Sequence, residues 1–226
     1  MSHKDTLVVV PAYNEINNLE SVILDLKKYF KNILIVDDGS DHSYEKILKS
    51  LDIKYVMHLV NLGQGAALHT GFTYFLSQKK LKYVVTFDGD GQNRGIDAKK
   101  MVEVIKKSDL SAVLGSRFID KKESSQIPFS KTLILKLAKL YERIFFNVRL
   151  TDAHNGLRVL KRDIIENFIL PIRNNDMNHA TEISYKIFKS KCKFKEFPIR
   201  VEYKNKKSQN PINAINIAFS NLYRRL

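Results

Sequence analysis

Cysteine and long hydrophobic runs are scarce in this chain. Cys192 is the only cysteine among 226 residues, so an internal disulfide and a zinc site built from cysteines are excluded. No apolar run approaches the roughly 20 residues that cross a bilayer. The first residues also lack the apolar segment and small-residue cleavage site of a signal peptide. These absences predict a soluble or peripheral protein in a reducing cytoplasm.

Acidic residues are outnumbered by basic ones. The chain holds 24 Asp and Glu against 38 Lys and Arg, a formal net charge of +14 at pH 7. This balance implies an anionic partner, which can be nucleic acid, an anionic membrane surface or a phosphorylated substrate. The length and a hydrophobic content of 44% fit one α/β domain, which we expect to cover residues 1–226.

Strand-like and helix-like segments alternate through the first half of the chain. Residues 6–10 form a β-branched and aliphatic run closed by Pro11, which is typical of a strand buried on both faces. Residues 16–30 carry apolar side chains at helical spacing. The alternation predicts a mostly parallel sheet with helices on both faces. Further strands are expected at 32–36, 54–58, 83–87 and 110–114, and further helices at 44–51, 65–77 and 98–107.

The regular alternation stops after Ser116. A polar linker at 121–125 precedes an amphipathic segment, 130–146, in which basic residues surround an apolar face, and a second such segment ends at residue 226. A basic amphipathic helix can lie on an anionic membrane surface, although most such helices pack on their own domain. We expect peripheral attachment to anionic lipid.

Two carboxylates stand one residue apart directly after the strand expected at 83–87. The sequence there is Asp88-Gly89-Asp90-Gly91-Gln92. Open α/β sheets bind ligands at the carboxyl edge, and carboxylate oxygens suit Mg²⁺ or Mn²⁺ on a diphosphate. The alternative is an acidic turn, because Asp and Gly are also common turn residues.

Acidic motifs follow the first two expected strands as well. They are Pro11-Ala12-Tyr13-Asn14-Glu15 and Asp37-Asp38-Gly39-Ser40. If these strands are neighbours, a pyrimidine ring can stack on Tyr13 while a carboxylate accepts hydrogen bonds from the base or the ribose. The alternatives are a helix start capped by Asn14 and an ordinary turn.

A glycine-rich segment, Gly63-Gln64-Gly65, opens the helix expected at 65–77. Backbone amides at such a helix start can hold a phosphate. The third glycine of a dinucleotide fingerprint is absent, and the motif follows the third strand instead of the first, so a nicotinamide site is disfavoured. The glycines can also serve only a tight turn.

The order of these motifs resembles that of family 2 glycosyltransferases, most closely the branch that resembles dolichyl-phosphate mannosyltransferase. The likeness extends over nearly the whole chain, although Asn93 stands where relatives commonly have histidine. The segments that carry it are 9–15, 36–40, 61–66, 87–92, 115–118, 151–158, 177–183 and 197–199.

The resemblance implies a GT-A fold and inverting transfer of a sugar from a nucleotide sugar, with residues 1–118 binding the donor and 119–226 the acceptor. Mn²⁺ or Mg²⁺ would sit on the donor diphosphate. Motif matching gives the nucleotide-sugar site as Pro11, Tyr13, Glu15, Asp37 or Asp38, Gly65, Asp88, Gly89 and Asp90, and the metal ligands as Asp88, Asp90 and Gln92.

The resemblance places acceptor chemistry around Asp152. A hydroxyl acceptor needs a general base, for which Asp152 is the first choice and Glu182 the second. A phosphate acceptor needs none, and Asp152 would then orient it or support an arginine such as Arg117. The alternative for Glu182 is an ion pair with Lys186 at i+4. The expected acceptor and diphosphate residues are Arg117, His154, Asn155, Arg158, His179, Lys206 and Lys207.

With the resemblance, these motifs imply a metal-dependent inverting glycosyltransferase of bacterial cell-surface glycan assembly. We expect a UDP-sugar donor, a lipid-linked or polysaccharide acceptor and a place at the cytoplasmic face of the membrane, with a homo-oligomer left open. The first alternative is a polyprenyl-phosphate sugar transferase. A nucleotidyltransferase would need a glycine-rich loop followed by Arg and Lys directly after the first strand, and the sequence has none there. A nucleic-acid-binding protein would not explain carboxylates at three strand ends.

Overall fold

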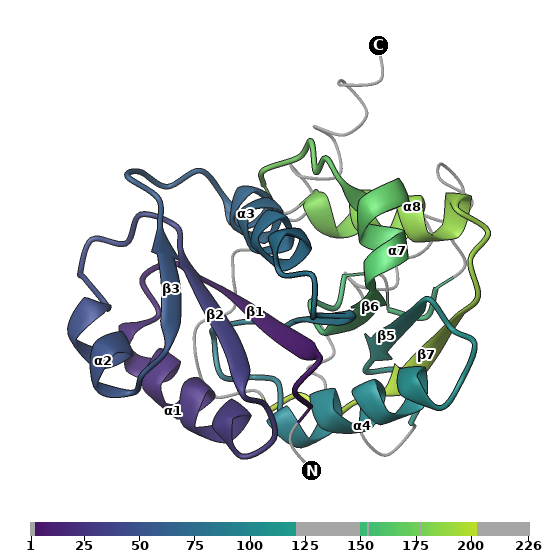
Figure 1. Ribbon diagram of the computed structural model, residues 1–226, viewed down its shortest axis with the longest axis horizontal. Helices are drawn as coiled ribbons and strands as arrows, with labels where there is room; N and C mark the ends of the chain where they lie inside the picture. The colour runs from purple at the N-terminus through teal and green to yellow at the C-terminus, as the bar shows by residue number, and fades with distance from the viewer. Residues whose placement is uncertain (1–2, 121–149, 153, 177, 203–226) are drawn as a thin grey trace.

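The computed structural model describes residues 3–120, 150–152, 154–176 and 178–202 (Figure 1). A seven-stranded sheet runs through it in the order β3-β2-β1-β4-β6-β5-β7. The strands are β1 (Thr6–Ala12), β2 (Asn32–Asp37), β3 (Lys54–Met57), β4 (Tyr83–Thr86), β5 (Ala112–Ser116), β6 (Arg158–Lys161) and β7 (Phe194–Pro198). The helices are α1 (Ile16–Lys27), α2 (Glu45–Ser50), α3 (Gln64–Ser77), α4 (Gly95–Lys106), α7 (Arg162–Ile164), the π-helix η1 (Ile165–Ile169) and α8 (His179–Lys189).

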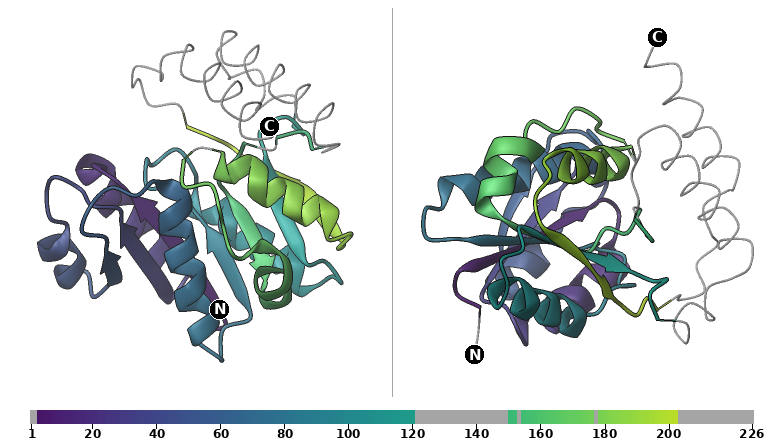
Figure 2. Two further views of the ribbon diagram at one scale, coloured as in Figure 1. Left: turned by 90° about the horizontal axis from the view of Figure 1, so that it is seen from above. Right: turned by 90° about the vertical axis from the view of Figure 1, so that its right-hand side faces the viewer.

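The sheet is mixed but mostly parallel. Strand β6 is antiparallel to both of its neighbours, β4 and β5, whereas all the other pairs are parallel. The predicted α/β class, with helices on both faces of one mostly parallel sheet, is therefore confirmed (Figure 1, Figure 2).

Two apolar layers cover the two faces of the sheet. Strand β1 is buried along its whole length, and its side chains alternate between the layers. Leu7 and Val9 pack with apolar residues of α3 and α8, whereas Val8 and Val10 pack with those of α1 and α4. This burial on both faces explains why β1 reads as an unbroken apolar run.

The strand at the N-terminus is longer than expected, because it passes through Pro11 and ends at Ala12. The Val9 carbonyl points toward β4 and accepts from Phe87 N at 3.0 Å. Backbone groups two residues apart in a strand point to the same side, so the nitrogen of Pro11 also faces β4. Strand β4 has already ended there at Thr86, so the missing N–H of proline costs no ladder bond.

Several other boundaries differ from expectation, and two of them are extensions. Strand β5 continues to Ser116, because pairing with β7 extends to the Ser116–Pro198 position. Helix α4 begins at Gly95, where Asp25 Oδ2 accepts from Gly95 N at 2.6 Å. Both extensions depend on partners far away in the sequence, which local patterns do not reveal.

The acidic turns meet at one edge of the sheet, as expected. Asp38 N donates to Ala12 O at 2.9 Å, which joins the turns after β1 and β2. A Cβ on Gly89 would lie 3.2 Å from Pro11 O, so the turn after β4 passes close to the end of β1.

The segments expected at 130–146 and before residue 226 lie outside the described residues, as do Lys206 and Lys207. Among the residues that are described, no helix combines the length and apolar character needed to cross a membrane.

Candidate active site

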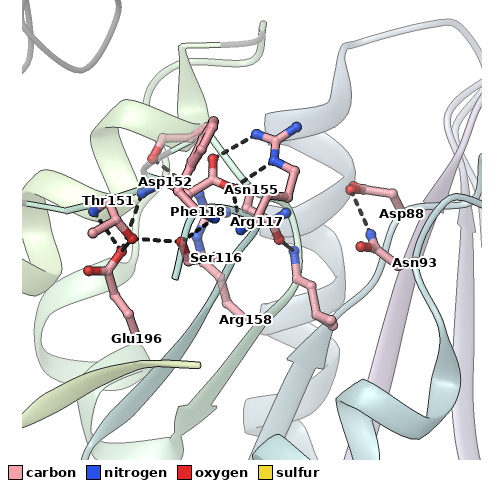
Figure 3. Close-up of polar contacts among 12 residues, drawn as sticks. Asp88, Asn93, Ser116, Arg117, Phe118, Thr151, Asp152, Asn155, Arg158 and Glu196 are labelled. Carbon is pink, nitrogen blue, oxygen red and sulfur yellow. Dashed lines mark hydrogen bonds and ion pairs between the residues drawn. The ribbon is translucent and has the colours of Figure 1, made fainter. Parts of the chain in front are cut away.

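Asp88 is held between two side-chain amides at the carboxyl end of β4. Gln64 Nε2 donates to its Oδ1 at 3.0 Å. Asn93 Nδ2 donates to its Oδ2 at 3.3 Å (Figure 3). Burial raises the pKa of Asp88 to about 6, and the charge of Asp90 adds to the shift. Asp90 is itself oriented by Gln92 N, which donates to Asp90 Oδ1 at 3.0 Å.

This pair of carboxylates fits a divalent cation. The raised pKa shows that Asp88 carries its negative charge at a cost, which a bound cation would relieve. The described part of the chain contains no group of three or more His, Cys, Asp or Glu side chains suited to a metal. Asp88 and Asp90 would therefore be completed by amide or ligand oxygens. The role of Gln92 as a ligand stays a prediction.

The acceptor-side motif lies directly against Asp88. A Cβ on Gly156 would overlap the Asp88 carboxylate, so only glycine fits at this position. Thr86 Oγ1 donates to Gly156 O at 2.5 Å and accepts from Arg158 N at 3.2 Å. The two halves of the predicted site therefore converge, although they are separated by about 70 residues in sequence.

The two aspartates after β2 have different surroundings. Asp38 accepts from Leu62 N at 3.1 Å and from Gly63 N at 2.7 Å, and it contacts His58 Nδ1 at 2.7 Å. Both of its oxygens hold the loop between β3 and α3. Asp37 accepts from Ser40 N at 3.1 Å through Oδ1. Asp37 is therefore the better candidate for binding a nucleoside.

The turn after β1 presents Tyr13 with 45% of its surface exposed. Glu15 N donates to Tyr44 Oη at 2.5 Å, and Asn18 Nδ2 donates to Glu15 Oε2 at 2.7 Å, so Glu15 is tied to α1. Asn14 does not cap this helix. It exchanges two hydrogen bonds with Asp41 instead, at 2.8 and 3.0 Å. The open Tyr13 ring remains available for stacking.

The glycines at the start of α3 serve close packing. Gly65 N donates to Asn175 O at 2.8 Å, and a Cβ on Gly65 would overlap Asn174 O. This amide is therefore directed at the chain's own backbone. A contact between Gly65 and the nucleotide sugar stays a prediction that this geometry does not favour.

Arg117 and Asp152 form a bidentate ion pair. Arg117 Nε donates to Oδ2 and Nη2 to Oδ1, both at 2.6 Å, and Arg117 N donates to Oδ2 at 3.0 Å (Figure 3). The side chains are 11% and 1% exposed, respectively. Both oxygens of Asp152 are engaged by Arg117, which favours the role of arginine support over that of a general base.

Glu182, the second base candidate, is engaged by its own surroundings. It accepts from Asn174 N at 2.8 Å and from Asn174 Nδ2 at 2.7 Å, and it pairs with Lys186 at 2.6 Å. Burial opposes ionisation, but hydrogen bonds from Lys186 and the loop outweigh it and lower the pKa of Glu182. The expected i+4 pair with Lys186 is present.

The other predicted acceptor residues line the interior. Arg158 is buried and donates through Nη2 to Ala180 O at 3.4 Å. His179 Nδ1 contacts Asp176 O at 2.7 Å, and burial lowers the His179 pKa to about 4. Asn155 Oδ1 accepts from Leu157 N at 2.8 Å, and His154 is half-buried. Contacts of these residues with an acceptor stay predictions.

Sequence reasoning missed several residues that shape the site. Gln64 lies within a recognised motif, but its bond to Asp88 crosses between two elements. His58, directly after β3, and Glu196, in β7, contact the site over 20 and 45 residues of sequence, and no local pattern marks either one.

Comparisons with known proteins agree with this geometry. Residues 7–169 match the model of the family described as glycosyl transferase family 2. An uncharacterized protein of Methanocaldococcus jannaschii is 30% identical over 229 residues, covering 99% of this chain and 94% of that protein. The UDP-N-acetylglucosamine–dolichyl-phosphate N-acetylglucosaminyltransferase of Methanococcus voltae is 27% identical over 246 residues, covering 100% and 96%.

A solved structure shares the fold. The crystal structure of glucosyl-3-phosphoglycerate synthase from Mycobacterium tuberculosis, in complex with Mn²⁺, UDP and phosphoglyceric acid, aligns with a TM-score of 0.64 at 15% identity. The alignment covers 96% of this chain and 78% of that one. The chain belongs to glycosyl transferase family 2 and is a glycosyltransferase with a GT-A fold.

Proposed function

We propose that this enzyme transfers a sugar from a UDP-sugar to the phosphate of an isoprenoid lipid, with Mn²⁺ or Mg²⁺ on the donor diphosphate. The observation that carries the proposal is the buried Arg117–Asp152 pair beside the Asp88 turn. A phosphate oxygen is already anionic at neutral pH, so it attacks without a base. It needs instead a fixed cation, which a carboxylate-oriented arginine provides.

A hydroxyl acceptor is less well supported. It would require a general base on the face opposite the leaving diphosphate. The two carboxylates that were candidates for this base are engaged by Arg117 and by Lys186. The Methanococcus voltae relative is named for a dolichyl-phosphate acceptor, which also favours a lipid phosphate here.

Asp88 and Asp90 would hold the cation, with Gln92 as a predicted third ligand. When bound, it would neutralise charge on the leaving diphosphate. Gln64 and Asn93 orient the Asp88 carboxylate toward this task. The Mycobacterium tuberculosis neighbour was crystallised with Mn²⁺ and UDP, which supports the same pairing of metal and nucleotide.

The nucleoside would lie between Tyr13 and Asp37. The exposed Tyr13 ring offers a stacking face, and Asp37 offers a carboxylate oxygen to a base or ribose donor. A compact pocket of one aromatic ring and one carboxylate suits uridine better than guanosine. Attachment to an anionic membrane at the cytoplasmic face is part of the proposal, since the lipid acceptor stays in the bilayer.

A matched pair of acceptors tests the proposal. Purified enzyme is incubated with Mn²⁺ and a panel of radiolabelled UDP-sugars, together with either a polyprenyl phosphate or the corresponding polyprenol. Labelled lipid should appear only with the phosphate, and chelation of Mn²⁺ should abolish it. Equal transfer to the free alcohol, or no transfer to the phosphate from any donor of the panel, would contradict the proposal.

A further inference from the structure

Glu196 lies outside the motifs that predicted the site, yet it holds the turn that carries Asp152. Its Oε1 accepts from Thr151 N and from Thr151 Oγ1, both at 2.7 Å, and from Asp152 N at 3.3 Å. Glu196 belongs to β7, the last strand of the sheet, where it pairs with Leu114. One carboxylate oxygen therefore fixes the backbone of the Thr151–Asp152 turn (Figure 3).

The hydroxyl groups beside this turn form a hydrogen-bond chain that can run in only one direction. A hydroxyl has one hydrogen to donate. Thr151 Oγ1 gives its hydrogen to Glu196, so it must accept in its 2.6 Å contact with Ser116 Oγ. Ser116 Oγ accepts in turn from Phe118 N at 3.2 Å. This hydrogen-bond chain ends at Glu196, where an atom that only accepts hydrogen bonds is required.

This chain anchors both members of the ion pair. On one side, Arg117 lies between Ser116 and Phe118, which the hydrogen-bond chain joins. On the other side, Asp152 directly follows Thr151, which the same chain joins to Ser116. The pair itself has short contacts of 2.6 Å at both oxygens. The geometry of the ion pair therefore depends on the Glu196 carboxylate, which itself contacts neither side chain of the pair in the hydrogen bonds described here.

We propose that Glu196 is a positioning residue, which sets the geometry of the Arg117–Asp152 pair so that Arg117 meets the acceptor phosphate. This inference rests on the proposed function and deepens it. Glu196 acts through Thr151 and Ser116, so its loss should affect use of the acceptor and leave the nucleotide site intact.

Four variants test the inference kinetically. Glu196→Ala removes the acceptor of the chain, and Glu196→Gln keeps an acceptor oxygen without the charge. Thr151→Val cuts the chain at its middle, whereas Thr151→Ser restores the hydroxyl. Lys195→Gln is the control, because Lys195 is exposed and neighbouring residues of a strand point to opposite faces.

The expected pattern separates acceptor from donor. For Glu196→Ala and Thr151→Val, kcat/KM for polyprenyl phosphate should fall about 100-fold. Glu196→Gln should lose about tenfold, since a neutral acceptor makes weaker hydrogen bonds. Thr151→Ser and Lys195→Gln should match wild type, and the Kd for UDP should change less than about twofold in every variant. Wild-type acceptor kinetics in Glu196→Ala, or a parallel loss of UDP binding, would overturn the inference.

Amide hydrogen exchange gives a readout that does not need turnover. In Glu196→Ala the amides of Thr151 and Asp152 should exchange at least about tenfold faster than in wild type, because both donate to Glu196. Unchanged exchange there would refute the anchoring role. If the wild-type enzyme does not use polyprenyl phosphate at all, the proposed function fails, and the exchange result still decides whether Glu196 holds this turn.

Discussion

Replacing Asp88 with asparagine should stabilise the metal-free protein while removing its response to metal. The pKa of Asp88 is raised from 3.8 to about 6 by burial, with a further contribution from Asp90. A raised carboxyl pKa means that stability is fully present below the unfolded pKa and is lost as the pH rises through the folded pKa. At 1.36 kcal/mol per pKa unit, a shift of about two units lowers the free energy of unfolding by about 3 kcal/mol above pH 7.

The local structure can accept the asparagine. Its oxygen can keep the hydrogen bond from Gln64, which is 3.0 Å long in the native site. Its amide would face Asn93 Nδ2, which donates to Asp88 in the native site, so the Asn93 amide must turn over. That rotation brings Asn93 Oδ1, a buried atom that has no hydrogen-bond partner among the residues described, into position to accept from the new amide. We therefore expect Asp88→Asn to gain about 1–3 kcal/mol in free energy of unfolding at pH 8, and close to nothing near pH 4.

Urea unfolding with EDTA at pH 4 and pH 8 measures this difference directly. Saturating Mn²⁺ should then stabilise the wild type by the usual binding linkage and leave Asp88→Asn unchanged. A variant that is no more stable at pH 8, or equally stabilised at both pH values, would refute the reasoning that the charge of Asp88 lowers the stability of the metal-free protein. Such a charge is the expected cost of a site prepared for a cation.

Three further predictions concern neighbouring residues. Gly156→Ala should reduce Mn²⁺-dependent transfer about 100-fold, because its Cβ would displace the Asp88 carboxylate. Circular dichroism should show that the fold is retained, and full activity would contradict the described contact. Burial lowers the His179 pKa from its ordinary value of 6.5 to about 4. Below pH 6.5 His179 is protonated in the unfolded chain but not in the folded one, so the free energy of unfolding should fall by up to about 3 kcal/mol as the pH falls to 4. His179→Asn should lose this pH dependence in urea unfolding, and an unchanged slope would rule out His179 as its source. In calorimetry, Asp37→Asn should weaken UDP binding about tenfold. Asp38→Ala should chiefly lower the free energy of unfolding, by about 3 kcal/mol, since it leaves the amides of the β3–α3 loop without an acceptor. A larger loss of UDP binding in Asp38→Ala and a larger loss of stability in Asp37→Asn would exchange their roles.

The fold could be predicted from the sequence because its strands are buried and its helices amphipathic. The run at β1 indicates burial on both faces, and the apolar spacing of α1 gives the covering helix. The antiparallel position of β6 between β4 and β5 could not be predicted, since strand pairing depends on contacts over more than 40 residues.

The site could be predicted as a set of motifs but not as a set of contacts. The carboxyl edge gathers Asp37, Asp38 and Asp88 because parallel strands end there, which is a consequence of topology. Which aspartate is engaged by amides of the β3–α3 loop is visible only in three dimensions. The same holds for Asp152, whose partner Arg117 lies 35 residues away.

The central claim, that Arg117 is held by Asp152 to receive an acceptor phosphate, is tested most directly by the rate of sugar transfer to polyprenyl phosphate in Arg117→Lys beside Asp152→Asn. Lysine keeps the charge but cannot form the bidentate pair, whose contacts are 2.6 Å at both oxygens. We predict that Arg117→Lys loses about 100-fold in transfer with unchanged UDP binding, and that Asp152→Asn retains more activity than Arg117→Lys. Abolished transfer in Asp152→Asn together with near wild-type transfer in Arg117→Lys would show instead that Asp152 is a catalytic base.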